Sequence, residues 1–184
     1  MPEAATAILI DFENLVLGLE PPGLEVPEAA LPSGPEALTR ILPVDVGALL
    51  DLARESGPVA VSNAYADWRL GIFNRHQVEL YRHGIELVHV LGRHLKNAVD
   101  VRLAIDAVEL IFERPHIETY VLVSGDRDFI HLLKTLKKHG KRVIGVAPER
   151  SASNDLEALC DRFTTYEALW AATRPPEAPE ARAA

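Results

Sequence analysis

Short apolar runs alternate along the chain with segments whose apolar residues recur every three or four positions. The runs predict buried strands, and they cover residues 5–10, 59–65, 85–90, 120–123 and 142–147. The periodic segments predict helices, and they cover residues 44–56, 67–83, 95–112 and 129–136. Strands that alternate with helices are typical of a three-layer α/β/α domain with a mainly parallel sheet. Residues 163–166 would add an edge strand, which gives a sheet of five to six strands.

Two segments fall outside this alternation. Residues 19–43 contain six prolines, which preclude a long regular helix. A loop of this length is usually either functional or disordered, so it is expected to be a lid, a substrate wall, a dimer contact or simply disordered. Residues 174–184 are rich in Pro, Ala and Glu and are predicted to form a disordered tail. Residues 1–173 are therefore predicted to be a single domain that carries the insertion.

Composition narrows the class of protein. The 184 residues are 48% hydrophobic and 25% charged, which is ordinary for a globular protein. No apolar run reaches the length of a membrane helix, and the N-terminus lacks the basic region of a signal peptide. Cys160 is the only cysteine, which excludes an intrachain disulfide and a thiolate zinc cluster. We therefore expect a cytoplasmic protein without a membrane partner.

The net charge of −8 is unevenly distributed. Several acids lie in the proline-rich segment and in the tail. From Arg127 to Arg150, by contrast, seven Lys or Arg side chains face only two acids. A basic surface that could contact nucleic acid is therefore compatible with the negative total, although solvated helix faces give a similar pattern.

The most informative turn follows the apolar run 120–123. Ser124, Gly125 and Asp126 come directly after it, and a helical pattern begins at Phe129. Strand, tight turn and helix in so few residues mark the carboxyl end of a parallel strand, where open α/β sheets bind ligands. Helix capping by Ser124 or Asp126 is the alternative interpretation.

Two more acids are predicted to reach the same edge. Asp11 directly follows the first apolar run, and Asp100 tops a mostly apolar stripe near the start of the helix 95–112. In a β-α-β crossover, that helix should begin at the edge of the sheet where the preceding strand ended, which is the edge that carries Asp11 and Asp126. Asp106 shares a polar stripe and is expected to be solvated. A second stripe of the same helix is predicted to face the core, and it consists of Val101, Ala104, Ile105, Val108 and Phe112.

Clustered carboxylates repel one another unless a cation neutralises them. Oxygen ligands without paired histidines or cysteines favour Mg²⁺ or Mn²⁺ over zinc. Such an ion best serves phosphodiester hydrolysis, because it activates water and offsets charge on the phosphate. Asn14 and Ser124 could orient water or phosphate, and Lys96 could neutralise the pentavalent intermediate.

Four short motifs, in this order, resemble those of the NYN family of PIN-like nuclease domains and of its LabA-like branch over roughly residues 5–170. The motifs are Asp11-Phe-Glu-Asn14, Lys96-Asn-Ala-Val-Asp100, Ser124-Gly-Asp126-Arg-Asp128-Phe129 and Gly140-Lys-Arg-Val. The resemblance implies a PIN-like fold with strand order 3-2-1-4-5 and metal-dependent ribonuclease activity. The long 19–43 insertion departs from the compact family pattern.

The resemblance also assigns roles by position. It implies that Asp11, Asp100 and Asp126 bind the metal and that Asp128 completes the catalytic acids. The positions implied to contact substrate are Asn14, Ser124, Lys96, Arg127 and Ser153. RNA, single-stranded or structured, is the implied partner, and a homodimer is compatible with it.

Two alternatives stay open at this point. The fold could serve a non-catalytic RNA- or protein-binding regulatory module. A phosphatase could use Asp11 as a nucleophile, although Glu13 stands where that chemistry favours a second aspartate.

Overall fold

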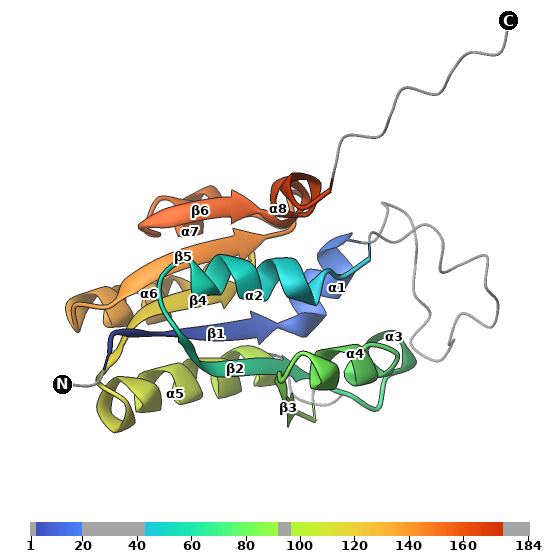
Figure 1. Ribbon diagram of the computed structural model, residues 1–184, viewed down its shortest axis with the longest axis horizontal. Helices are drawn as coiled ribbons and strands as arrows, with labels where there is room; N and C mark the ends of the chain where they lie inside the picture. The colour runs from blue at the N-terminus through green and yellow to red at the C-terminus, as the bar shows by residue number, and fades with distance from the viewer. Residues whose placement is uncertain (1–2, 20–42, 92–96, 175–184) are drawn as a thin grey trace, which may run out of the picture.

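In the computed structural model, which describes residues 3–19, 43–91 and 97–174, the strands form one parallel sheet (Figure 1). They are β1 (Ala5–Asp11), β2 (Val59–Ala66), β3 (Glu86–His89), β4 (Ile117–Val123), β5 (Arg142–Ala147) and β6 (Arg162–Thr165). Their order is β3-β2-β1-β4-β5-β6. The predicted order is confirmed, and the sixth strand lies at the edge beside β5.

Helices cover both faces of the sheet (Figure 1). One layer contains α1 (Phe12–Leu19), α2 (Val46–Arg54), α3 (Gly71–Asn74), α4 (Gln77–Arg82) and α8 (Tyr166–Ala172). The other contains α5 (Ala98–Glu113), the 3₁₀ turn η2 (Arg127–Phe129), α6 (Ile130–Lys138) and α7 (Asn154–Glu157). Every residue of β1 is buried. Alternate side chains of a strand point to opposite faces, so Ile8 and Ile10 join one core while Ala7 and Leu9 join the other.

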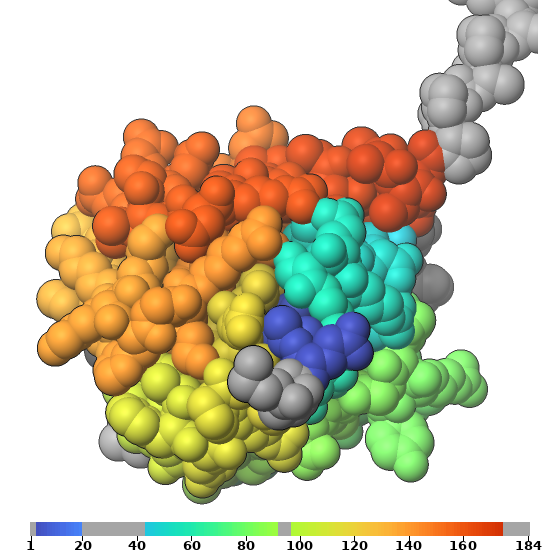
Figure 2. Space-filling model, turned by 60° about the vertical axis from the view of Figure 1, so that its left-hand side comes forward, coloured from blue at the N-terminus to red at the C-terminus, as the bar shows by residue number. Residues whose placement is uncertain are grey.

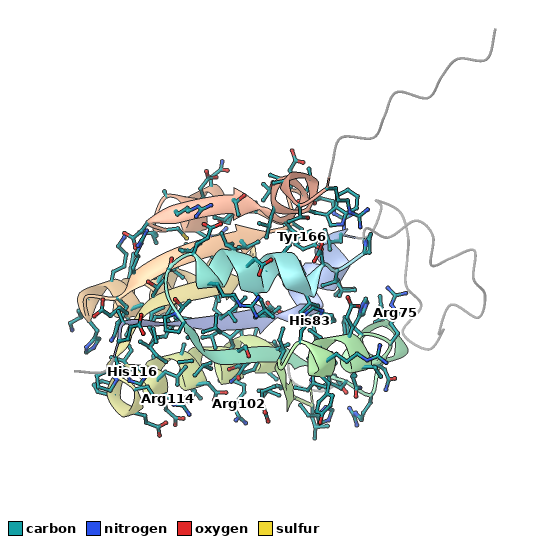
Figure 3. The ribbon with its side chains drawn as sticks, viewed as in Figure 1. Arg75, His83, Arg102, Arg114, His116 and Tyr166 are labelled. Carbon is teal, nitrogen blue, oxygen red and sulfur yellow. The ribbon has the colours of Figure 1, made fainter. Side chains whose placement is uncertain are left out.

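Tyr166 joins the end of the sheet to the start of α2 (Figure 3). Its hydroxyl donates to the carbonyl of Pro43 at 2.7 Å and accepts from the amide of Asp45 at 2.5 Å. The Asp45 side chain in turn caps α2 by accepting from the amide of Ala48 at 2.9 Å. This contact fixes where the chain re-enters the domain after the proline-rich segment. Most of that segment, residues 20–42, and the tail 175–184 lie outside the described residues.

The predicted helix 67–83 is wrong in its extent, because the structure has two short helices there, α3 and α4. Side chains hold an open turn before them: the carbonyl of Trp68 accepts from Asn74 Nδ2 at 3.2 Å and from Gln77 Nε2 at 3.1 Å. Two large apolar residues of this segment, Val78 and Tyr81, are 61% and 79% exposed. The segment ends at Gly84, whose φ of +75° suits the residue after a helix C-cap.

The predicted core face of α5 is also wrong. Val101, Ile105 and Phe112 are 56%, 50% and 67% exposed. The core contacts come from the opposite side of the helix, through Val99, Leu103, Ala107, Leu110 and Ile111. Both faces of this helix are apolar, and periodicity alone does not say which one the sheet covers. Within the described parts of the chain, no helix combines the length and hydropathy needed to cross a bilayer.

Candidate active site

The first pair of predicted site residues meets where β1 and β4 end. These strands are neighbours, with Ile10 opposite Val123, so the residues that follow, Asp11 and Ser124, lie at the same level of the sheet. There the Ser124 hydroxyl donates to Oδ2 of Asp11 at 3.0 Å. Both residues are buried, with Ser124 0% and Asp11 3% exposed. The structure thus brings together two chain segments more than a hundred residues apart at the carboxyl edge.

Asn14 connects α1 to the turn that follows β4. The chain enters α1 immediately after Asp11, whose Oδ1 accepts from the amide of Asn14 at 3.0 Å and so caps the helix. Oδ1 of Asn14 then accepts from the amide of Gly125 at 2.9 Å. Asn14, predicted to orient water or phosphate, therefore also holds the β4 turn against α1.

The acids after β4 form a compact capped turn. The Ser124 hydroxyl accepts from the amide of Asp126 at 3.2 Å, and Oδ1 of Asp126 accepts from the amide of Asp128 at 2.8 Å. Asp126 therefore caps η2, as the alternative interpretation suggested. Asp126 is partly exposed, while Arg127 and Asp128 are exposed. Capping uses one carboxylate oxygen and holds the side chain at the edge of the sheet.

The loop after β5 packs directly on Gly125. A Cβ at position 125 would lie 2.2 Å from the carbonyl oxygen of Ser151, so only glycine fits there. Ser151 also lies beside Asn14, with Oγ 3.4 Å from Oδ1. Ser153, the predicted substrate contact, precedes α7 without capping it through its side chain. In the loop after β5, the serine that contacts the site residues is thus Ser151, two residues before Ser153.

Asp100 completes the acidic edge from the first turn of α5. Its pKa is raised to about 6, first by burial and then by the negative charges of Asp126, Asp128 and Glu13. Burial raises the pKa of Asp11 to about 7, against the lowering effect of the Asn14 amide, and the charge of Asp100 adds to the rise. The charge of Asp100 therefore acts on Asp11, and the charges of Asp126, Asp128 and Glu13 act on Asp100.

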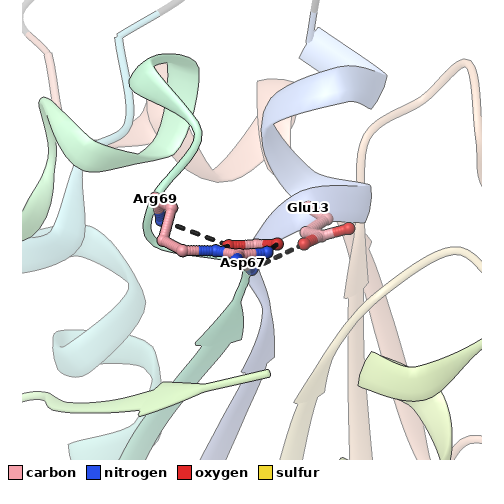
Figure 4. A network of polar contacts seen from close by, with 3 residues as sticks. All are labelled: Glu13, Asp67 and Arg69. Carbon is pink, nitrogen blue, oxygen red and sulfur yellow. Dashed lines mark hydrogen bonds and ion pairs between the residues drawn. The ribbon is translucent and has the colours of Figure 1, made fainter. Parts of the chain in front are cut away.

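Glu13 and Asp67 belong to the same edge and were missed by the sequence analysis. Glu13 Oε1 accepts from the amide of Asp67 at 2.7 Å, which ties α1 to the end of β2 (Figure 4). Arg69 donates two hydrogen bonds to the Asp67 carboxylate, from Nε to Oδ1 at 2.8 Å and from a terminal nitrogen to Oδ2 at 2.6 Å. This pairing lowers the pKa of Asp67. Asp67 directly follows a strand, the signal that identified Asp11, so it could have been found.

Asp106 is not the solvated residue that its polar stripe predicted. Its Oδ2 accepts from the hydroxyl of the buried Tyr65 at 3.1 Å, and its Oδ1 accepts from Arg102 Nε at 2.8 Å. It lies about one and two-thirds turns beyond Asp100 on α5 and belongs to a separate polar network. Asn97 Nδ2 reaches Asp128 Oδ2 at 3.4 Å, while Lys96 lies outside the described residues.

The donor chemistry of this edge fits a hard divalent cation. Within residues 3–19, 43–91 and 97–174, no three His, Cys, Asp or Glu side chains converge closely enough to hold one ion by themselves. Mg²⁺, however, usually keeps several waters and binds through one or two carboxylates together with substrate phosphate. A cation would also relieve the repulsion that, after burial, raises the pKa of Asp100. The three-carboxylate set of Asp11, Asp100 and Asp126 stays a prediction.

The parallel sheet with its acidic β1–β4 edge is consistent with a PIN-like fold. The chain belongs to the NYN domain family, whose sequence pattern matches residues 5–167. NYN domains are part of the PIN-like nuclease superfamily. A crystal structure of a protein of unknown function from Vibrio parahaemolyticus has the same fold, with a TM-score of 0.62 at 22% identity. The match covers 89% of this chain and 93% of that one.

An uncharacterized protein of Methanocaldococcus jannaschii is 29% identical over 136 residues, which is 72% of this chain and 52% of that protein. The chain thus spans about half the length of this relative.

Replacing Ser124 by alanine should destabilise the fold and loosen the site. The hydroxyl both donates to Asp11 and accepts from the Asp126 amide in a buried position. Leaving these groups unpaired should lower the free energy of unfolding by about 1–3 kcal/mol. Urea unfolding measures this. Ser62→Ala, which removes an exposed bond to the Gly84 carbonyl, is the control and should cost under about 0.5 kcal/mol. Equal midpoints for both variants would contradict this account of Ser124.

The raised pKa values predict how stability depends on pH without a cation. Asp11 and Asp100 have folded-state pKa values of about 7 and about 6, above their ordinary 3.8. At a pH between the ordinary and the folded-state pKa values, the folded protein binds more protons than the unfolded chain. The stability that Asp11 and Asp100 contribute therefore falls as pH rises from about 4 to about 7. Urea unfolding in chelator at about pH 5 and about pH 8 should show this fall. The fall should be smaller in Asp100→Asn, and an equal fall would contradict the assigned shift.

Proposed function

We propose that residues 1–173 form one domain that acts as a divalent-cation-dependent ribonuclease, hydrolysing RNA phosphodiester bonds at the carboxyl edge of the sheet. The observation that carries this proposal is the gathering of carboxylates at this edge, with Asp11 at the end of β1, Asp126 after β4 and Asp100 in the first turn of α5. Burial first, and then the charges of Asp126, Asp128 and Glu13, raise the pKa of Asp100. Mutually repelling carboxylates favour a cation among them. Carboxylate oxygens prefer hard ions such as Mg²⁺ and Mn²⁺, and the superfamily to which NYN domains belong is one of nucleases.

Asp11, Asp100 and Asp126 are the residues proposed to hold the ion, with Asp128 as the fourth catalytic acid. A bound ion of this kind activates water and offsets charge on a phosphoryl oxygen. The chain fixes the acids beforehand through its own hydrogen bonds. Asp11 is oriented by the Asn14 amide and the Ser124 hydroxyl, and Asp126 is oriented by the Asp128 amide. Such support determines how well ligands keep their geometry.

Cationic and polar groups around the acids are proposed to bind the RNA backbone. Arg127 is exposed at the start of η2, beside Asp126. Lys96 and Ser153 are proposed to act with it. Phosphate contacts position RNA without reading its sequence, so these groups would serve single-stranded or structured substrates alike.

A non-catalytic RNA- or protein-binding regulatory module on the same fold is the second candidate. It is favoured by the finding that no three acidic, His or Cys side chains of the described segments converge on one point. A phosphatase with Asp11 as nucleophile is disfavoured, because both oxygens of this 3% exposed carboxylate already accept hydrogen bonds.

Cleavage of a mixed panel of labelled RNAs, with Mn²⁺, with Mg²⁺ and with chelator, separates the two candidates. The proposal predicts cutting that needs the ion and is lost in Asp126→Asn. Asparagine keeps an oxygen that can cap η2, so a loss reports on charge rather than on folding. An absence of cutting with every RNA, or cutting that persists in chelator, would reject the nuclease.

A further inference from the structure

The outer face of α5 carries an apolar stripe that neither the sheet nor another described helix covers. Val101, Ile105 and Phe112 are at least half exposed, and Val108, between them on the helix, is partly buried. These residues follow one another at spacings of four, three and four, which places them in one row along the helix. Large apolar side chains gathered in a row on the surface mark an interaction site.

The two long borders of this α5 stripe carry opposite charge. On the border towards β2 lie the exposed Glu109 and Glu113. Of the two arginines on this side, Arg102 is paired with Asp106 at 2.8 Å, and Arg114 donates to the carbonyl of Ala60 at 3.2 Å. Arg102 and Arg114 mark this side of α5 along the lower edge of Figure 3. On the other border lies α6, which packs beside α5. In Figure 2 the end of α5 is yellow, and it borders an amber and orange surface, which is formed by residues later in the chain.

The α6 border is basic near the end of the stripe. Phe112 contacts His139 edge to face, with ring centroids 5.4 Å apart, so the end of α6 lies level with the end of α5. Both helices run from the carboxyl edge to the amino edge of the sheet, because each precedes the next parallel strand. The exposed Lys138 directly precedes His139 and so lies at this end of the α6 border, and the exposed His131 lies on the same side of α6 about two turns earlier. Lys137 is on the opposite side, bonded to Asp161 at 2.7 Å.

This arrangement of charge fits a second copy of the same chain. A two-fold axis that runs along the stripe lays each acidic border over the basic border of the partner. An axis perpendicular to the stripe would instead oppose like charges, which costs free energy. We propose that the α5 stripe is the centre of a two-fold homodimer in which the two α5 helices run parallel. Glu109 of each copy lies near Lys138 of the partner. The proposal is independent of the nuclease activity.

Analytical ultracentrifugation of the full chain over a range of concentrations tests this proposal. We expect a monomer–dimer equilibrium in the wild type. Ile105→Asp should weaken it at least about tenfold, because it puts an unpaired charge at the centre of the interface. Val78→Asp is the matched control, since Val78 is equally apolar and 61% exposed but lies on α4. Circular dichroism confirms that both variants are folded. A wild-type monomer at every concentration, or a dimer that survives Ile105→Asp, would overturn the proposal.

A charge swap tests the direction of the axis. Lys138→Glu alone and Glu109→Lys alone should each weaken the dimer, because each opposes like charges across the interface. The double variant should restore it, since the two borders are then exchanged. Added salt should weaken the wild-type dimer, as screening predicts for exposed pairs. A double variant no better than the single ones would contradict the axis along the stripe.

Discussion

Replacing Asp100 by asparagine is expected to abolish RNA cleavage and at the same time to stabilise the fold. Asp100 is proposed as a cation ligand, and even residues that only support ligands cost 10–100-fold when removed, so the loss should be about 100-fold or more. Its ionised form is opposed by burial and by three neighbouring acids. With a discount for its partial exposure, removing the charge should add about 1 kcal/mol at about pH 8. That would raise the melting temperature by about 2–4 °C.

Asp106→Asn is the matched control on the same helix, and it should behave in the opposite way. Asp106 accepts hydrogen bonds from Tyr65 and pairs with Arg102, away from the acidic edge. Asparagine there weakens a favourable network, so the melting temperature should fall while cleavage stays near the wild-type rate. Cleavage assays and calorimetry on the two variants give both readouts. Unchanged cleavage in Asp100→Asn, or a lowered melting temperature, would contradict the role given to Asp100.

Gly125→Ala is expected to be the most destabilising single-methyl change near the site. The added Cβ would lie 2.2 Å from the Ser151 carbonyl oxygen and 2.6 Å from its carbon, both backbone atoms. The loop after β5 must therefore move, and overpacking of this kind typically costs about 1–3 kcal/mol or more. The same movement would disturb the bond between the Gly125 amide and Asn14. Stability and cleavage should fall together.

Gly84→Ala separates this steric effect from backbone strain. Gly84 has a φ of +75° but nothing lies within 4 Å of its added Cβ, so only the left-handed conformation is penalised. That penalty is about 1–2 kcal/mol, and cleavage should be unaffected. Chemical unfolding of both variants beside the wild type makes the comparison. Full cleavage activity in folded Gly125→Ala would show that the Ser151 loop does not support the site.

The alternation of strands and helices followed from the sequence because it depends on local signals, whereas the strand order was implied by the resemblance to NYN domains. Each apolar run is a buried strand, and an acid after such a run must lie at the carboxyl edge. The same rule would have included Asp67, which directly follows β2. Its amide donates to Glu13, and its carboxylate accepts from Arg69. The sequence analysis predicted no helix directly after the first strand, where Asp11 caps α1.

What the sequence did not predict depends on contacts between distant segments. The approach of Ser151 to Gly125 joins β4 to the loop after β5, and no local pattern specifies it. The orientation of α5 is a similar case. Two apolar stripes compete for the sheet, and the side with Leu103 and Ala107 is buried. The stripe with Ile105 is left on the surface, where it becomes the proposed dimer contact.

Calorimetric titration of Mn²⁺ into the wild type and Asp100→Asn, at about pH 8 in the absence of RNA, tests the central claim most directly. The claim is that the acidic edge formed by β1, β4 and α5 binds a divalent cation. The account predicts saturable binding to the wild type and binding weaker by at least about tenfold in the variant. No heat of binding in the wild type, or equal affinity in the two proteins, would contradict the proposed metal site.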